Sequence, residues 1–279
     1  MSGAEVVVVV GDLHAGSSVA LCTPEHPIVD DGVWKANAIQ AWMYDRWIEA
    51  TTQWLPRVLN GRPYVLVVNG DCIEGLHHGT KQVISSATSD HVALAHTLLE
   101  PLAGPAERTF MVRGTSAHVG HDTEHTLGVL LGAQRCPDSE RPTYARHNWR
   151  FEVKGKVVDA AHHIQTSARP WTEASGLGAA MKAAILESVD AEEPVADVLL
   201  RAHRHRYGYY SDGKRLIVVG SSWQAKTDFA EKVVPHARVV VGMHVLDFGD
   251  AVDNGLPVVR SWRRSPDPTA MVCVSKEVA

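Results

Sequence analysis

Two short runs of the sequence pair residue types that bind divalent metal ions. Asp12 and His14 are separated by one residue, and so are His203 and His205. If the chain stays extended across each run, the two side chains leave on the same side and can chelate one ion. Carboxylate oxygens and imidazole nitrogens together suit divalent metal ions. These runs therefore predict a metal site.

A third candidate ligand, Asp71, follows Gly70 just as Asp12 follows Gly11. A strand that ends in Gly-Asp is also a common turn, and for either position alone a turn explains the residues equally well. The joint pattern is harder to explain by turns. An isolated carboxylate beside two chelating pairs suits two divalent ions that share it as a bridge.

Buried strands are expected directly before these residues. The β-branched run Val6–Val10 leads to Asp12, and the run 64–68 leads to Asp71. A short strand at 109–112 leads to Gly114 and Thr115. Because ligands of α/β sheets bind beyond the carboxyl ends of the strands, we expect these side chains to converge on one side.

The rest of the chain alternates between predicted strands and helices. Apolar residues at helical spacing predict a helix over 34–55, ended by Pro56 and Gly61, and a second helix with Ser89 as its N-cap. A third helix is expected at 172–188. Further strands are predicted at 149–153, 157–161, 195–200, 216–219 and 239–246. We expect residues 1–264 to form one domain and residues 265–279 a C-terminal tail.

Composition narrows the class of protein. The 279 residues are 45% apolar, which is enough for a large core, and 27 basic against 32 acidic residues give a net charge of −5. That balance does not favour binding through phosphate-backbone contacts alone. The apolar run Val6–Val10 is too short to span a membrane and has no basic segment before it, which predicts a cytoplasmic protein. Four separated cysteines without a Cys-x-x-Cys pair suit reduced thiols.

The order of these motifs resembles that of the calcineurin-like metallophosphoesterase family. Gly11-Asp12-Leu13-His14 matches its Gly-Asp-x-His, Gly70-Asp71 its second Gly-Asp, and Ala202-His203-Arg204-His205 its closing Gly-His-x-His. His162 or His163 follows a predicted strand where the family has a single metal-binding histidine, and His162 is the better match. The resemblance runs from residue 6 to about 247. The compact single-domain form, which lacks an Asn usual in the family, resembles bacteriophage members.

The resemblance implies a fold, a ligand set and an activity. The fold is a two-sheet αββα sandwich with helices on both outer faces. Two divalent ions are expected, with manganese first and iron or zinc as alternatives. The implied activity is hydrolysis of a phosphodiester or phosphomonoester of nucleotides or nucleic-acid ends, through a hydroxide that bridges the ions. The implied ligands are Asp12, His14 and His205 for the first ion, Asp71 as the bridge, and His162 and His203 for the second.

One block departs from the family pattern. Where Gly-Asn-His is expected, the chain has Gly114-Thr115-Ser116-Ala117-His118, so the amide ligand is missing and the histidine is displaced by two residues. We expect His118 to protonate the leaving oxygen, although it could instead complete the second ion's shell, as could water. His121 and His125 are rival candidates for the proton donor.

Other side chains are candidate substrate contacts. Arg113 and His78 are expected to contact the phosphate, and Arg169 offers the same forked donors. The segment 74–78 either lines the substrate cleft or forms an exposed loop. Trp223 and Gln224 could form a rim that stacks a base, although a core position for Trp223 explains the sequence equally well. Two other functions fit the same ligands, a metal-dependent amidase and a metal-binding scaffold without catalysis.

Overall fold

The computed structural model of the chain describes most of its residues. The described ranges are 3–29, 31–77, 79–120, 122–137, 139–164, 173–233, 237–250 and 254–266. The predicted tail from residue 265 lies almost wholly outside these ranges. Among the described residues, no helix combines the length and the apolar character needed to cross a membrane.

The larger sheet has six strands, and its central strands are parallel. Their order across the sheet is β13 (Val258–Arg264), β12 (Val241–Asp247), β1 (Val6–Val10), β4 (Tyr64–Asn69), β5 (Arg108–Val112) and β6 (Ala145–Arg146). β1, β4, β5 and β6 run parallel, and β12 and β13 are antiparallel additions at the edge. Every residue of β1 and β4 is buried, as expected for parallel strands covered on both faces.

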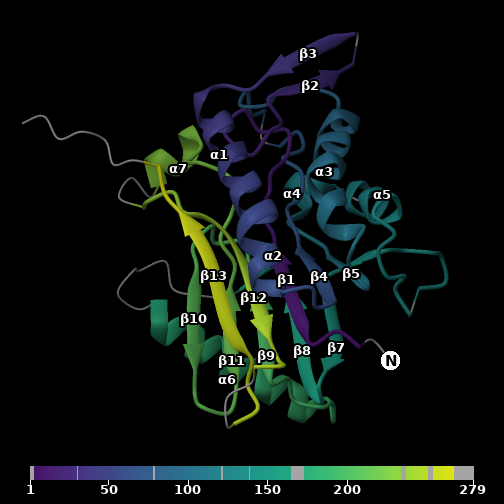
Figure 1. Cartoon of the computed structure of the whole chain (residues 1–279), viewed down its shortest axis with the longest axis vertical. Helices are drawn as coiled ribbons and strands as arrows, with labels where there is room; N and C mark the ends of the chain where they lie inside the picture. Colours follow the sequence, from purple (N-terminus) through teal and green to yellow (C-terminus); the bar gives the residue numbers. More distant parts are fainter. Residues whose placement is uncertain are drawn as a thin grey trace, which may run out of the picture.

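The second sheet has five strands in the order β10 (Gly208–Ser211), β11 (Leu216–Val219), β9 (Val198–Arg201), β8 (Lys156–Ala161) and β7 (Asn148–Val153). β8, β9 and β11 are parallel, so their carboxyl ends meet at one edge. A separate hairpin of β2 (Glu25–Ile28) and β3 (Gly32–Lys35) projects at the top of Figure 1.

Most helices gather on one side of the larger sheet. They are α1 (Ala38–Ile48), the π-helical turn η1 (Glu49–Trp54), α2 (Leu55–Leu59), α3 (Thr88–Ala103), α4 (Ser116–Val119) and α5 (Thr123–Leu130). In the described part of the chain, two further helices are α6 (Glu173–Asp190), at the bottom of Figure 1, and the short α7 (Asp228–Val233).

Alternating side chains of β1 explain the layers. Val6, Val8 and Val10 pack with residues of α1, α3 and α5, whereas Val7 and Val9 pack with β8, β9 and β11 of the second sheet. The outer face of the second sheet packs on α6 through Leu177 and Met181. Because strand side chains alternate between faces, each central strand contributes to two cores. The predicted two-sheet αββα sandwich is confirmed.

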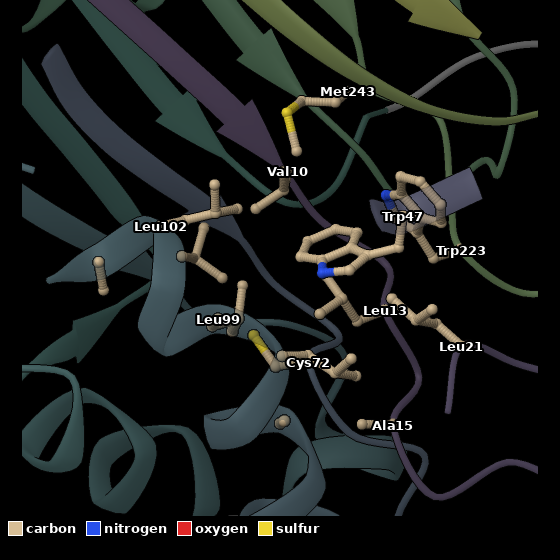
Figure 2. Packing of buried hydrophobic residues seen from close by; sticks show 14 of the residues in the cluster. Val10, Leu13, Ala15, Leu21, Trp47, Cys72, Leu99, Leu102, Trp223 and Met243 are labelled. Atoms are coloured by element: carbon tan, nitrogen blue, oxygen red, sulfur yellow. The ribbon is translucent and has the colours of Figure 1, made fainter. Parts of the chain in front are cut away.

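Residues next to the expected metal ligands belong to the helix-covered core. Leu13, between Asp12 and His14, is fully buried, and so is Cys72, which follows Asp71. Figure 2 shows Leu13 among the side chains that surround Trp47 and Trp223. Packing of these neighbours holds the ligand loops from beneath.

Several local predictions are wrong, and each has a physical reason. The helix predicted over 34–55 begins at Ala38, because Asn37 provides a capping box with Gln40 and Trp34 pairs in the β2–β3 hairpin. It also continues through Pro56, which sits in the first turn of α2 where no donor is needed. Ser89 lies inside α3 rather than capping it.

One histidine serves the fold. His244 of β12 is buried, its Nε2 accepts a hydrogen bond from Ser221 N (3.0 Å), and its Nδ1 lies 2.9 Å from Ser261 Oγ. Its ring stacks on Tyr207. Burial, with a smaller effect of Arg263, lowers the pKa of His244 to about 3. The ring is therefore neutral in the folded protein at any ordinary pH.

We predict that His244 makes the protein sensitive to mild acid. The unfolded chain takes up a proton near pH 6.5 whereas the folded chain does not, so stability falls as the pH drops below 6.5. The free energy of unfolding of the wild type should fall by roughly 2 kcal/mol more than that of His244→Gln between pH 7 and pH 5. Urea unfolding at both pH values measures the difference. His96→Gln controls for loss of a histidine, and equal losses in wild type and His244→Gln would contradict the prediction.

Candidate metal centre

The expected ligands lie in loops at the carboxyl ends of strands from both sheets. Asp12 follows β1 and Asp71 follows β4 in the larger sheet, while His162 follows β8 and His203 follows β9 in the second. The loops are hydrogen-bonded to one another. Asp12 N donates to Gly70 O (2.9 Å), and His14 N donates to Asp71 O (3.0 Å). The two sheets thus present their ligands at a common edge.

Backbone strain concentrates in the same residues. Nine described residues other than glycine have a positive φ, and five of them are Asp12, His14, Asp71, His203 and His205, with φ between 47° and 71°. The extended conformation predicted for the two chelating runs is therefore wrong. A left-handed conformation costs a non-glycine residue roughly 1–3 kcal/mol, and such residues cluster at functional sites. Their convergence arises from this bent backbone rather than from strand alternation.

Two glycines allow the loops to approach closely. Gly70 has a φ of +78°, and a Cβ there would lie 2.5 Å from His162 Nδ1. A Cβ at Gly114 would lie 2.2 Å from the backbone nitrogen of Asp71. No other residue fits at either position without displacing a candidate ligand.

Asp12, His14 and His205 form the first group of possible ligands, with ligand atoms within 4.8 Å of one another. His14 Nδ1 pairs with Glu74 Oε2 (2.8 Å), so in the neutral imidazole the lone pair of Nε2 faces inward. That nitrogen lies 3.0 Å from His205 Nε2 and 4.0 Å from Asp12 Oδ1. An imidazole fixed by a carboxylate at its other nitrogen is typical of metal sites.

Asp71 and His162 form the centre of a second group with Asp12. His162 Nδ1 lies 2.7 Å from Asn69 O and donates to it, and Nε2 lies 2.9 Å from Asp71 Oδ2 and 3.9 Å from Asp12 Oδ1. Both carboxylates and the imidazole are almost fully buried. His162 therefore has the orientation that a metal-binding imidazole needs, with one nitrogen tied to the backbone.

His203 and His163 lie on the exposed side of the buried group formed by Asp12, Asp71 and His162. The side chain of His203 is 42% exposed, and its Nδ1 lies 3.9 Å from Asp71 Oδ2. His162, His163 and His203 form a third group with ligand atoms within 4.8 Å of one another. The side chain of His205, also 33% exposed, marks the same open side.

The electrostatics of the two aspartates suit a bound cation. Burial raises the pKa of Asp71, but hydrogen bonds with His162 and His203 lower it more, so the pKa lies well below its ordinary value. The pKa of Asp12 is also lowered, because the imidazoles of His205 and His162 outweigh its burial. Both side chains are thus charged at neutral pH.

Asp12 offers a direct test of whether a metal fits. Its Oδ1 is buried and has no hydrogen-bond partner, although the Nε2 atoms of His205, His162 and His14 face it at 3.5, 3.9 and 4.0 Å. A buried charged oxygen without a partner is costly unless an ion neutralises it. Two carboxylates and several inward imidazoles are ligands for manganese, iron or zinc. The residues present therefore fit divalent cations.

Glu74 organises the side of the site near His14. It is buried and accepts hydrogen bonds from His14, His77 Nε2 (2.9 Å) and Gln224 Nε2 (2.9 Å). Burial raises its pKa, but the pairing with His14 and His77 outweighs this and lowers the pKa to about 2. The reading of 74–78 as a plain exposed loop is wrong for Glu74. Its position three residues after Asp71 is the signal that could have assigned it to the site.

His118 lies beside this carboxylate. Its Nδ1 lies 2.9 Å from Glu74 O and donates to it, which leaves Nε2 as the other exchangeable position. Its ring packs edge-on against His14 at a centroid distance of 4.7 Å. Burial and the neighbouring His14 lower its pKa. His14, Glu74 and His118 form the fourth group of possible ligands.

Glu124 supports the site from behind and was missed in the sequence. Its carboxylate accepts hydrogen bonds from Gly114 N (2.7 Å) and Cys72 N (3.3 Å), the neighbours of Thr115 and Asp71. Burial raises its pKa to about 7. The sequence feature that could have predicted its burial is its place on the apolar face of α5, one turn before Leu127.

Other predicted contacts lie elsewhere or outside the described residues. Arg113 donates from Nη2 to Gly120 O (2.7 Å) and lines a separate cavity of about 290 Å³ with Glu124, His125 and Arg141. Trp223 is fully buried and stacks on Trp262, so it forms no rim. His78, His121 and Arg169 lie outside the described residues.

Comparisons with known proteins give only weak likenesses. No family model matches the chain, and no curated protein matches it. Among solved structures, similar ones are Vps29 from Entamoeba histolytica complexed with zinc (13% identity, TM-score 0.43, covering 93% of this chain and 98% of that chain), an archaeal phosphodiesterase (10%, 0.43, 93% and 99%) and YfcE, a phosphoesterase from E. coli (13%, 0.41, 93% and 98%). The expected likeness to bacteriophage members stays a prediction. The function of this chain is inferred from its own residues.

Proposed function

We propose that this chain is a metal-dependent phosphoric ester hydrolase with a two-metal centre. The proposed ligands are Asp12, His14, Asp71, His162, His203 and His205. The proposed substrates are phosphodiesters or phosphomonoesters of nucleotides or nucleic-acid ends, with manganese as the first metal to test.

The observation that carries the proposal is the buried, unpartnered Oδ1 of Asp12 facing three imidazole nitrogens. A purely structural polar cluster would satisfy this oxygen with a donor. Asp71, nearly as buried, belongs to the same cluster. Two charged carboxylates with ligand oxygens within 4.8 Å of each other favour divalent cations as their counter-charge.

Divalent ions at these residues would neutralise the oxygens of a phosphate ester and lower the pKa of water enough for hydroxide to exist at neutral pH. The protein's own part is to hold the ligands rigidly. Glu74 fixes His14, and the carbonyl of Asn69 fixes His162, so neither ring has to reorient. His78, outside the described residues, stays a proposed contact to the phosphate oxygens; Arg113 would reach them only by leaving Gly120 O.

His118 is the proposed proton donor to the leaving oxygen. Its Nδ1 is held by the carbonyl of Glu74, so Nε2 is the nitrogen that can give a proton to substrate. Its lowered pKa makes the imidazolium a stronger acid, while a smaller share of the protein carries the proton at neutral pH. A general acid matters most when the leaving group is a poor one, such as the hydroxyl of a sugar.

We predict that Asp71→Asn abolishes turnover and weakens binding of both ions, because one shared charge is lost. With manganese supplied, hydrolysis of bis(p-nitrophenyl) phosphate should fall by at least about 10³-fold, and the metal bound per chain, measured after dialysis, should also fall. Asp45→Asn, on the exposed side of α1, is the matched control and should behave as wild type. Full activity in Asp71→Asn would refute the two-metal mechanism.

The same assay separates the alternative functions. Tightly bound metal with no turnover of any phosphate ester would favour a scaffold. Turnover of nitroanilide amides in place of the esters would favour an amidase. Removal of metal by a chelator should abolish ester hydrolysis, and added manganese should restore it.

We predict that the effect of His118→Asn depends on the leaving group. Asparagine can still donate to the carbonyl of Glu74 but cannot act as an acid at neutral pH. Cleavage of an ester with an alkyl or ribose leaving group should slow by about 10²–10⁴-fold, and cleavage of a nitrophenyl ester much less. The kcat values for a series of leaving groups measure this.

His125→Asn is the control, because His125, the rival proton donor, accepts a hydrogen bond from Tyr144 N and lines the separate cavity rather than the candidate metal centre. A uniform loss in His118→Asn for all leaving groups would assign His118 a positioning role rather than an acid role.

A further inference from the structure

Thr115 stands where the resemblance places an amide ligand of the second ion. Its hydroxyl donates to Asp71 Oδ2 (3.0 Å) and lies 3.2 Å from His203 Nδ1 and 3.4 Å from His163 Nε2. Its backbone nitrogen donates to Asp71 Oδ1 (2.6 Å). Thr115 thus orients Asp71. As a metal ligand, however, its neutral hydroxyl is weaker than the amide oxygen that it replaces. The second ion needs another donor.

His163 reaches the same point from the second sheet. Its ring lies 4.7 Å from that of His203 and 4.9 Å from that of His162, measured between centroids. The three imidazoles form one group of possible ligands, separate from the group around His14. His163 is exposed, so its ring can turn toward an ion without disturbing a core.

His118 and water explain the geometry less well. The ring of His118 packs against His14, and its Nδ1 is committed to the carbonyl of Glu74, so it belongs to the side of the first ion. Water needs no protein donor, yet Nε2 of His163 already lies beside Thr115. A third imidazole at this point has no evident structural purpose, because like side chains that can carry charge repel one another there.

We infer that His163 replaces the missing amide, so that Asp71, His162, His163 and His203 hold the second ion. This inference rests on the proposed two-metal function. Exchange of an amide oxygen for an imidazole nitrogen makes the ligand set richer in nitrogen, and imidazole suits zinc and iron better than manganese. The second site should therefore favour zinc over manganese more strongly than the same site with an amide ligand would.

Metal titration of the apo protein tests the inference without an activity assay. Calorimetry with zinc, and separately with manganese, should show two ions per wild-type chain. In His163→Ala the first ion should bind as in wild type, and the second should bind at least about 100-fold more weakly, since loss of even an outer partner costs about 10–100-fold. When cobalt is titrated instead, the visible spectrum of His163→Ala should match that of wild type for the first equivalent and differ from it for the second.

A compensating variant adds a positive result. Thr115→Asn combined with His163→Ala puts an amide back at the N-cap of α4, where asparagine is favoured. This double variant should regain the second ion and shift its preference from zinc toward manganese. His147→Ala removes a nearby exposed histidine and is the matched control.

The outcomes separate the two proposals. Wild-type binding of two ions by His163→Ala, with an unchanged cobalt spectrum, would overturn the role of His163 and leave the two-metal function intact. Fewer than two ions per wild-type chain would overturn the two-metal function itself. Circular dichroism of each variant checks that a lost ion does not reflect a lost fold.

Discussion

Close burial of two charged carboxylates is the constraint on which the rest of this molecule depends. Asp12 and Asp71 are at most 1% exposed and share the imidazole of His162. Removing two like charges from water is costly, and nearby opposite charge must compensate it. Imidazoles supply part of that compensation, but Asp12 Oδ1 remains without a hydrogen-bond partner. The arrangement therefore fits divalent cations as the remaining counter-charge.

The fold meets this constraint by joining the edges of two sheets. Parallel strands of both sheets end at the same place, and strained left-handed residues turn the ligands inward there. Such strain persists only when the surroundings hold it, and here buried neighbours do so. Leu13 and Cys72 pack into the core directly beside Asp12 and Asp71. Packing of these core residues therefore maintains the geometry of the site.

Two further glutamates show how the partners of a buried carboxylate decide its charge. Glu74 and Glu124 are both almost fully buried, but pairing with His14 and His77 lowers the pKa of Glu74 to about 2, whereas burial raises that of Glu124 to about 7. Glu74 faces imidazoles that can carry positive charge, whereas Glu124 has backbone N–H groups of Gly114 and Cys72 as partners and lies near Asp71. The first orients a candidate ligand, and the second ties together the loops that carry Asp71 and Thr115.

Local pattern was enough to predict the layered α/β class and the candidate ligands, because both depend on short-range features. Apolar runs predict buried strands, and the Gly-Asp pairs that follow them, Gly11-Asp12 and Gly70-Asp71, predict candidate ligands at the strand ends. The conformation of the ligand loops, the hairpin around Trp34 and the core position of Trp223 depended on distant partners. So did the meeting of Thr115 with His163, 48 residues apart. Residue types and order belong to the sequence, whereas the distance between atoms far apart in the chain is decided only when two sheets pack together.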